Sequence, residues 1–217
     1  MPQNLRADAQ ENRDKILDAA RALFSERGLE VSMREVARRA EVGPATLYRR
    51  FPTKQALIDN AFEDELRTCR QIVTDGCADP DPWRGFSSVI EDLSVLNVQN
   101  RGFVDAFMSA NPQAPVFAHH RSALLRQLQA LISRAKRAGR LRHDFAIEDL
   151  VLILLAGRGL SSTRPATRTA AARRFAALAL DAFRENATNS TLPRKPPLVE
   201  EVIHISPPPT ISPTPRR

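Results

Sequence analysis

The stretch Val42-Gly43-Pro44-Ala45-Thr46-Leu47-Tyr48-Arg49-Arg50-Phe51-Pro52-Thr53-Lys54 predicts a helix of about two turns with one inward face. Gly43 suits the N-cap position and Pro44 the first helical position, and Pro52 ends the run. Leu47 and Phe51 are four residues apart, so they share the inward face with Pro44. A helix this short is unstable alone, so it must pack against a neighbour.

The other face of this helix points outward and is chemically distinctive. It carries a small residue, a hydroxyl, a phenol and two guanidinium groups: Ala45, Thr46, Tyr48, Arg49 and Arg50. These groups are suited to contact phosphates and base edges in the major groove of DNA.

The preceding residues predict the neighbour. Ser32-Met33-Arg34-Glu35 has the pattern of a capping box, and Val36, Ala37 and Ala40 follow with helical spacing. Residues 40–43 then form a short turn that contains Gly43. A helix, a short turn and a second helix make up a helix-turn-helix, whose second helix enters the groove.

Residues 12–58 resemble the N-terminal DNA-binding domain of the TetR family of bacterial regulators. The carrying motif is Leu47-Tyr48-Arg49-Arg50-Phe51-Pro52-Thr53-Lys54, which is similar to the family's leucine-tyrosine-x-x-phenylalanine signature followed by a lysine. We predict DNA contacts by Ser32, Arg34, Gly43, Pro44, Ala45, Thr46, Tyr48, Arg49, Arg50 and Lys54.

Composition is compatible with DNA binding and argues against other classes. The 217 residues carry a formal charge of +7, with six basic and two acidic residues between Ser32 and Lys54. No segment is long and apolar enough to span a bilayer, so we expect a cytoplasmic protein. We find no Gly-rich phosphate loop, metal-ligand spacing or nucleophile-base set, and therefore expect neither an enzyme, a cofactor nor a metal.

The remaining pattern predicts an all-α protein. Residues 1–11 form a polar arm, expected to be flexible, and the first helix buries Ile16, Leu17, Ala20, Leu23 and Phe24 before ending at Gly28. A single helix of about 23 residues, roughly 35 Å long, is expected from Thr53 to about Thr74, with Asp75-Gly76 ending it. We interpret it as a rigid rod.

Residues 59–186 are expected to form a second helical domain. Asp81-Pro82-Trp83, Arg140-Leu141-Arg142 with Asp144, and Glu148-Asp149-Leu150 resemble the C-terminal domain of the SbtR-like branch of the family. The resemblance implies that a small-molecule effector of unknown identity enters a cavity here and releases the operator. Its candidate lining residues, each also explicable as plain core, are Trp83, Phe86, Phe103, Phe107, Met108 and Phe117.

The last two predicted helices carry more apolar surface than one small domain can cover. Residues 147–160 are apolar on nearly every side, and residues 166–184 have two apolar faces. They are expected to pair with a second copy in a four-helix bundle, as the resemblance also implies; a monomer is the alternative. Candidate interface residues are Leu150, Leu154, Gly157, Ala171, Phe175, Leu178 and Ala182.

Residues 187–217 are rich in proline and are expected to be disordered. Taken together, the sequence favours a repressor that binds a palindromic operator as a homodimer and is released by a small molecule. The alternative is a helix-turn-helix protein that acts as a constitutive DNA binder or a protein-binding module.

Overall fold

The computed structural model describes residues 2–108, 115–157, 159–160 and 164–197, and within these ranges the protein consists of ten α-helices without a β-strand. The expected all-α class is therefore confirmed. The helices are α1 (Pro2–Arg27), α2 (Met33–Arg39), α3 (Pro44–Arg50), α4 (Lys54–Ala61), α5 (Glu63–Ala78), α6 (Pro82–Gln99), α7 (Arg101–Met108), α8 (Pro115–Arg137), α9 (Ile147–Gly157) and α10 (Pro165–Phe183).

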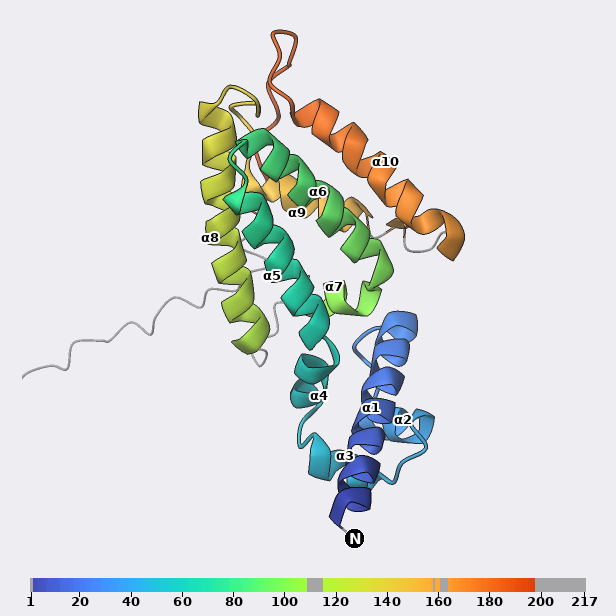
Figure 1. Cartoon of the computed structure of the whole chain (residues 1–217). Coiled ribbons are helices and arrows are strands. Elements are labelled where there is room, and N and C mark those ends of the chain that lie inside the picture. The colour runs from blue at the N-terminus through green and yellow to red at the C-terminus, as the bar shows by residue number, and fades with distance from the viewer. Residues whose placement is uncertain (1, 109–114, 158, 161–163, 198–217) are drawn as a thin grey trace, which may run out of the picture.

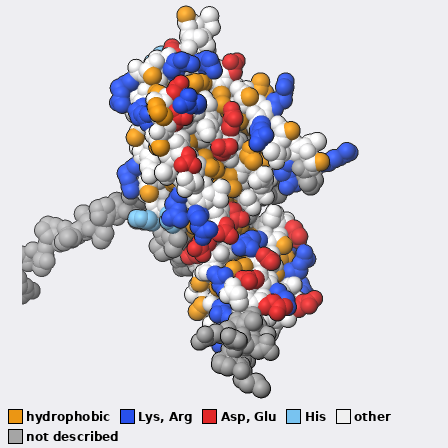
Figure 2. Space-filling view, viewed as in Figure 1, with side chains coloured by type: hydrophobic (Ala, Val, Ile, Leu, Met, Phe, Trp, Pro, Cys, Tyr) orange, Lys and Arg blue, Asp and Glu red, His pale blue; other side chains and the backbone are white. Residues whose placement is uncertain are grey.

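The helices form two lobes, a small one of α1–α4 and a larger one of α5–α10 (Figures 1 and 2). The apolar stripe predicted on α1 is buried throughout and packs against α2 and α4. The helix begins at Pro2, however, so residues expected to form an arm continue α1. Their sequence contains Leu5, Ala7, Ala9 and Glu11, which favour helix.

The predicted single rod after Pro52 is wrong, because the chain bends at Phe62. This residue has φ −114° and ψ 19°, ending α4 and starting α5. Arg21 of α1 donates from Nε to the carbonyl of Ala61 at 2.7 Å, the group that a continuous helix would pair with the amide of Glu65. Three acidic residues, 63–65, fill the first turn of α5, where the helix dipole favours negative charge.

The prediction that Asp75-Gly76 ends this segment is also wrong. Gly76 lies inside α5 and faces Gly85 of α6, and a Cβ at Gly76 would overlap the side chain of Val89. The glycine is therefore a close-packing position between two helices. Arg134 of α8 donates to the carbonyls of Cys77 and Asp79 at 2.6 and 2.8 Å, which satisfies the C-terminal end of α5.

Helix α6 is the centre of the larger lobe and packs against α5, α7, α8, α9 and α10. Asp81 caps its N-terminus by accepting hydrogen bonds from the amides of Trp83 and Arg84. Helix α7 connects the lobes, because Gly102 lies against the backbone of Phe24 in α1. Phe62 stacks at 6.0 Å between Phe24 and Phe103, so one aromatic series runs from the small lobe into the larger one.

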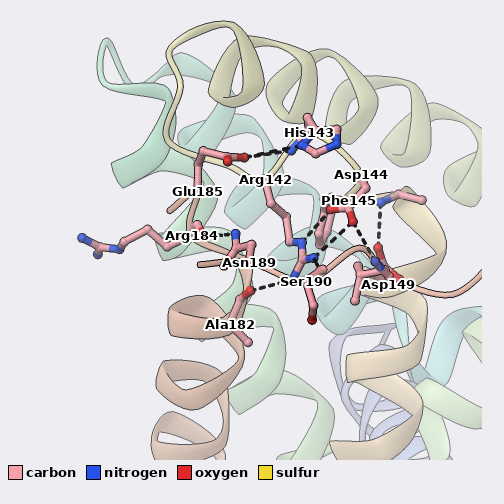
Figure 3. A network of polar contacts seen from close by, with 12 residues as sticks. Arg142, His143, Asp144, Phe145, Asp149, Ala182, Arg184, Glu185, Asn189 and Ser190 are labelled. Atoms are coloured by element: carbon pink, nitrogen blue, oxygen red, sulfur yellow. Dashed lines mark hydrogen bonds and ion pairs between the residues drawn. The ribbon is translucent and has the colours of Figure 1, made fainter. Parts of the chain in front are cut away.

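The first part of the expected disordered tail is bonded to the larger lobe. We call residues 184–197 the strap; it follows α10 and runs back along the turn between α8 and α9 (Figure 3). Arg142 pairs with Asp144 at 2.6 Å, and these two side chains bind the strap at the carbonyl of Ser190 and the amide of Leu192. Further along, Lys195 donates to Glu148 at 2.8 Å. Residues 198–217 lie outside the described ranges.

Candidate DNA-binding interface and effector cavity

The helix-turn-helix begins with the predicted capping box. The amide of Glu35 donates to Ser32 Oγ at 3.3 Å, and the amide of Ser32 donates to Glu35 Oε2 at 3.0 Å. Donation from Ser32 and the guanidinium of Arg27, 2.7 Å away, lower the pKa of Glu35 to about 2. The start of α2 is thereby fixed.

The turn between α2 and α3 depends on Glu41 rather than on Gly43. Glu41 has φ 55°, a left-handed conformation that side chains other than glycine seldom adopt. The amide of Glu41 donates to Arg38 O and that of Val42 to Ala37 O, which is the Schellman pattern that ends a helix. Gly43 is the N-cap of α3 as predicted, in an extended conformation with φ −64°.

The exposed face of α3 has the composition expected from the sequence. Leu47 and Phe51 are buried and attach α3 to the small lobe. Ala45, Arg49 and Arg50 are exposed, Thr46 is half-buried, and Tyr48 is 46% exposed although it is aromatic. A row of polar and cationic groups therefore lies on a helix that is held rigidly from behind.

The flanking candidates lie on the adjoining helix starts. Ser32 and Arg34 are exposed at the N-terminus of α2, as are Gly43 and Pro44 at the start of α3. The prediction that Pro44 shares the inward face of α3 is therefore wrong, because the first residue of the helix lies beyond the packed turn. Lys54 is the first residue of α4, whose N-cap Thr53 accepts from the amide of Ala56 at 3.0 Å. No acidic residue occurs in this first turn, so the helix dipole and Lys54 together favour an anion.

The larger lobe contains a cavity of about 80 Å³. Its walls come from α5–α9 and are almost entirely apolar. The lining residues are Cys69, Val73, Leu93, Leu96, Asn97, Phe103, Val104, Phe107, Arg121, Leu124, Leu125, Leu128, Leu150, Val151 and Leu154.

Two of the six predicted effector-binding residues, Phe103 and Phe107, line this cavity. Phe117 packs against both of them, with ring centroids 6.4 Å from Phe103 and 6.2 Å, edge to face, from Phe107. The side chain of Met108 lies outside the described part of the structure.

The other two predicted residues pack away from the cavity. Trp83 and Phe86 join Phe145 and Phe183 in an aromatic cluster near the strap. Helical spacing shows that an aromatic residue faces inward, but not whether it lines the cavity or joins the cluster near the strap. The prediction therefore fails for Trp83 and Phe86.

Three cavity residues that sequence reasoning missed carry polar atoms: Cys69, Asn97 and Arg121. Burial raises the pKa of the Cys69 thiol to about 12, so this thiol stays neutral. Burial also lowers the pKa of Arg121, whose Nη1 donates to the carbonyl of Phe107 at 2.5 Å. The available signal was a polar residue on an otherwise apolar helix face, as Asn97 lies one turn after Leu93 and two turns after Ile90 on α6.

The predicted dimer residues divide between the inside and the outside of the protein. Leu150 lines the cavity, and Gly157 is buried against Asn97 and Phe175. Ala171, Phe175 and Leu154 are half-buried and Ala182 is exposed. Leu178 is 61% exposed and Leu152 of α9 is 42% exposed; in the described part of the chain, Tyr48 is the other exposed large hydrophobic residue.

The small lobe therefore defines a helix-turn-helix protein, joined to a helical domain that contains a cavity. Comparison with known families agrees: residues 16–61 match "Bacterial regulatory proteins, tetR family", and residues 81–185 match "Transcriptional regulator SbtR-like, C-terminal domain". The chain belongs to the TetR family of transcriptional regulators, with a DNA-binding N-terminal domain.

Two curated regulators match this chain over a short stretch. The regulator UidR of Escherichia coli K12 is 42% identical over 59 residues, 27% of this chain and 30% of that protein. The repressor KstR of Rhodococcus jostii is 50% identical over 65 residues, 29% and 31% of the two chains. These matches with curated relatives thus span about a third of their length.

Solved structures match over most of the chain. The TetR regulator SCO0520 of Streptomyces coelicolor is 32% identical, covering 81% of this chain and 99% of that one, with a TM-score of 0.50. PfmR of Thermus thermophilus shares the fold at 20% identity and a TM-score of 0.62, covering 82% of this chain and 99% of that one.

None of the helices in the described ranges has the length and apolar character needed to cross a bilayer.

Proposed function

We propose that this protein is a cytoplasmic repressor that binds a palindromic operator as a homodimer and releases it when a small molecule fills the cavity. The observation that carries the DNA-binding part is the exposed row of polar and cationic residues on α3, backed by buried Leu47 and Phe51. In a helix-turn-helix this helix enters the major groove.

The side chains of this interface divide into base contacts and phosphate contacts. Arg49 contacts a base, preferably guanine, because a guanidinium binds O6 and N7 of guanine through two hydrogen bonds. Arg50 is the second candidate for this contact. Thr46, Tyr48 and Lys54 bind phosphates, with Ser32 adding one contact from the start of α2.

The dimer forms through α9 and α10. Ala171, Phe175, Leu178 and Ala182 follow one another at spacings of four, three and four residues, so they form one stripe along α10. Leu152 adds exposed apolar surface from α9. Pairing with the same surface of a second copy covers both helices and places two α3 helices on one operator.

The effector acts on the small lobe through α7 and the bend between α4 and α5 at Phe62. Phe103 and Phe107 line the cavity, and Phe103 stacks on Phe62 at 6.0 Å. A ligand that displaces these rings therefore acts directly on the point where α4 meets α5. The two α3 helices must lie about one DNA turn, roughly 34 Å, apart, so a shift of a few ångströms disrupts binding.

The test is a comparison of two substitutions in the purified protein. Arg49→Ala should cost about 1–3 kcal/mol on the operator and reduce base preference at one position of each half-site. Lys54→Ala should weaken binding to operator and random DNA alike and reduce the salt dependence by roughly one ion. Fluorescence anisotropy over a salt series measures both quantities.

The matched control is Arg67→Ala. Arg67 is an exposed arginine on α5, paired with Asp64 at 2.8 Å, and its loss should leave DNA binding unchanged. If Arg49→Ala and Lys54→Ala lose the same affinity for operator and for random DNA, the assignment of base and phosphate contacts is wrong.

A further inference from the structure

One amide interrupts the hydrocarbon wall of the cavity. Asn97 of α6 lines the cavity, is 4% exposed, and is surrounded there by leucine, valine and phenylalanine side chains. Burying an amide is unfavourable unless its donor and its acceptor are both hydrogen-bonded.

The orientation of this amide follows from its neighbour. Asn97 Nδ2 lies 2.6 Å from the carbonyl oxygen of Leu154 in α9. Because a carbonyl oxygen only accepts hydrogen bonds, the amide must turn its NH₂ group toward Leu154. The backbone of Gly157 lies close behind, since a Cβ there would be 3.2 Å from Nδ2. The amide is therefore held with its Oδ1 directed away from Leu154.

Asn97 Oδ1 is the acceptor that remains. It is buried and has no hydrogen-bond partner among the described residues. The thiol of Cys69 and the guanidinium of Arg121 are the other polar groups at the cavity. Arg121 extends its Nη1 to the carbonyl of Phe107 at the end of α7, so its aliphatic stem contributes to the apolar wall.

We propose that the cavity binds a neutral, mainly hydrocarbon molecule that donates one hydrogen bond to Asn97 Oδ1. The apolar walls supply affinity by burying the hydrocarbon, and the single acceptor selects for a hydroxyl or an N–H group. That this molecule is the effector rests on the proposed function, whereas its binding to the cavity does not.

The test uses two isomers that differ in one donor. Octan-1-ol and 1-methoxyheptane have the same atoms and nearly the same hydrocarbon length, but the ether cannot donate a hydrogen bond. Isothermal titration of the full chain should show the alcohol binding roughly 3- to 10-fold more tightly, the range expected for one neutral hydrogen bond.

Substitutions test whether Asn97 is the group that accepts the hydrogen bond from the alcohol. Asn97→Leu keeps the branched shape and the number of side-chain heavy atoms and removes the acceptor, so the two isomers should bind this variant equally. Leu96→Ala is the matched control. It removes apolar contacts from the neighbouring position of the cavity wall, so it should weaken the binding of both isomers by the same factor. The isomer comparison in the unchanged protein is valid whether or not Asn97→Leu folds, which circular dichroism reports.

Three results would overturn the proposal. The first is equal binding of the two isomers to the unchanged protein, and the second is absence of binding by either at its solubility limit. The third is octanoate binding more tightly than octan-1-ol, with the advantage retained in Asn97→Leu and lost in Arg121→Met. That result would assign the cavity to an anionic ligand.

Binding is measured here without DNA, so the two proposals fail independently. If the alcohol binds with the expected preference but does not release the operator, the cavity chemistry stands and the effector role fails. If the protein binds no operator, the isomer preference is unaffected.

Discussion

Glu41 is the residue whose backbone is most strained in the described part of the chain. It is the one residue there other than glycine with a positive φ, 55°, and it forms the turn between α2 and α3. A left-handed conformation is unfavourable for a side chain with a Cβ. The position of α3 relative to α2 therefore depends on a conformation that the local sequence disfavours.

Glu41→Gly should stabilise the protein by about 0.5–1 kcal/mol, because glycine adopts a positive φ without steric cost. Part of this gain is offset, since glycine also gives the unfolded chain more conformational entropy. Urea denaturation measures the change. Glu41→Ala is the control, since it removes the carboxylate but keeps the Cβ, and it should give no such gain. Equal stabilisation by both substitutions would show that the charge, and not the backbone, is responsible.

At the scale of helices, the contact between α7 and α1 leaves no room for a side chain at Gly102. A Cβ on Gly102 would lie 2.8 Å from the carbonyl carbon of Phe24, closer than side chains approach a backbone. Neither backbone can yield without moving its whole helix. The cavity wall and the DNA-binding lobe are thus in direct contact at this glycine.

Gly102→Ala should therefore destabilise the protein by about 1–3 kcal/mol through overpacking and should change the effector response. Thermal unfolding and operator release by ligand are the two measurements. Gly159→Ala is the matched control, because a Cβ there meets nothing within 4 Å. Unchanged stability and response in Gly102→Ala would exclude α7 as the connection between the lobes.

The success of sequence reasoning differed between helices for a physical reason. The capping box at Ser32, the N-cap at Gly43 and the stripe on α1 follow from neighbours within four residues, and all three are confirmed. The bend at Phe62 depends on Arg21, which is 40 residues away along the chain. The acids at 63–65 were a local sign of a new helix start, but apolar residues at helical spacing continue across the bend.

The cavity could be predicted only in part from the sequence. Phe103 and Phe107 were found because they are large, whereas Trp83 and Phe86 share that property and lie in another cluster. Which face of α6 meets α8 and which meets the strap depends on tertiary packing. Asn97 was missed because its role follows from the carbonyl of Leu154, 57 residues away.

At the scale of the whole molecule, the stripe on α10 is the surface through which we propose that two copies of the chain pair. Leu178→Glu should give a monomer, because a carboxylate at the centre of an apolar interface loses its hydration without gaining a partner. The monomer should lose operator binding, since one half-site provides too few phosphate contacts. Light scattering and anisotropy are the measurements, and a folded dimer of Leu178→Glu would place the interface elsewhere.

Ala177→Glu is the control for this prediction. Ala177 is exposed on the same helix and points about 100° away from Leu178, outside the stripe. The same charge at this position should leave the dimer intact. Phe175→Glu is a less clean test, because Phe175 is half-buried and packs on Gly157 inside the protomer.

The strap also has a practical consequence for where the C-terminal domain is considered to end. The family match stops at residue 185, whereas Ser190, Leu192 and Lys195 still bind Arg142, Asp144 and Glu148. A chain cut at residue 185 would expose the ion pair between Arg142 and Asp144. It would also leave the buried Glu148 without its partner Lys195. Its Tm should be about 2–6 °C below that of a chain cut at residue 197. Equal melting of the two truncated chains would mean that the shorter boundary is sufficient.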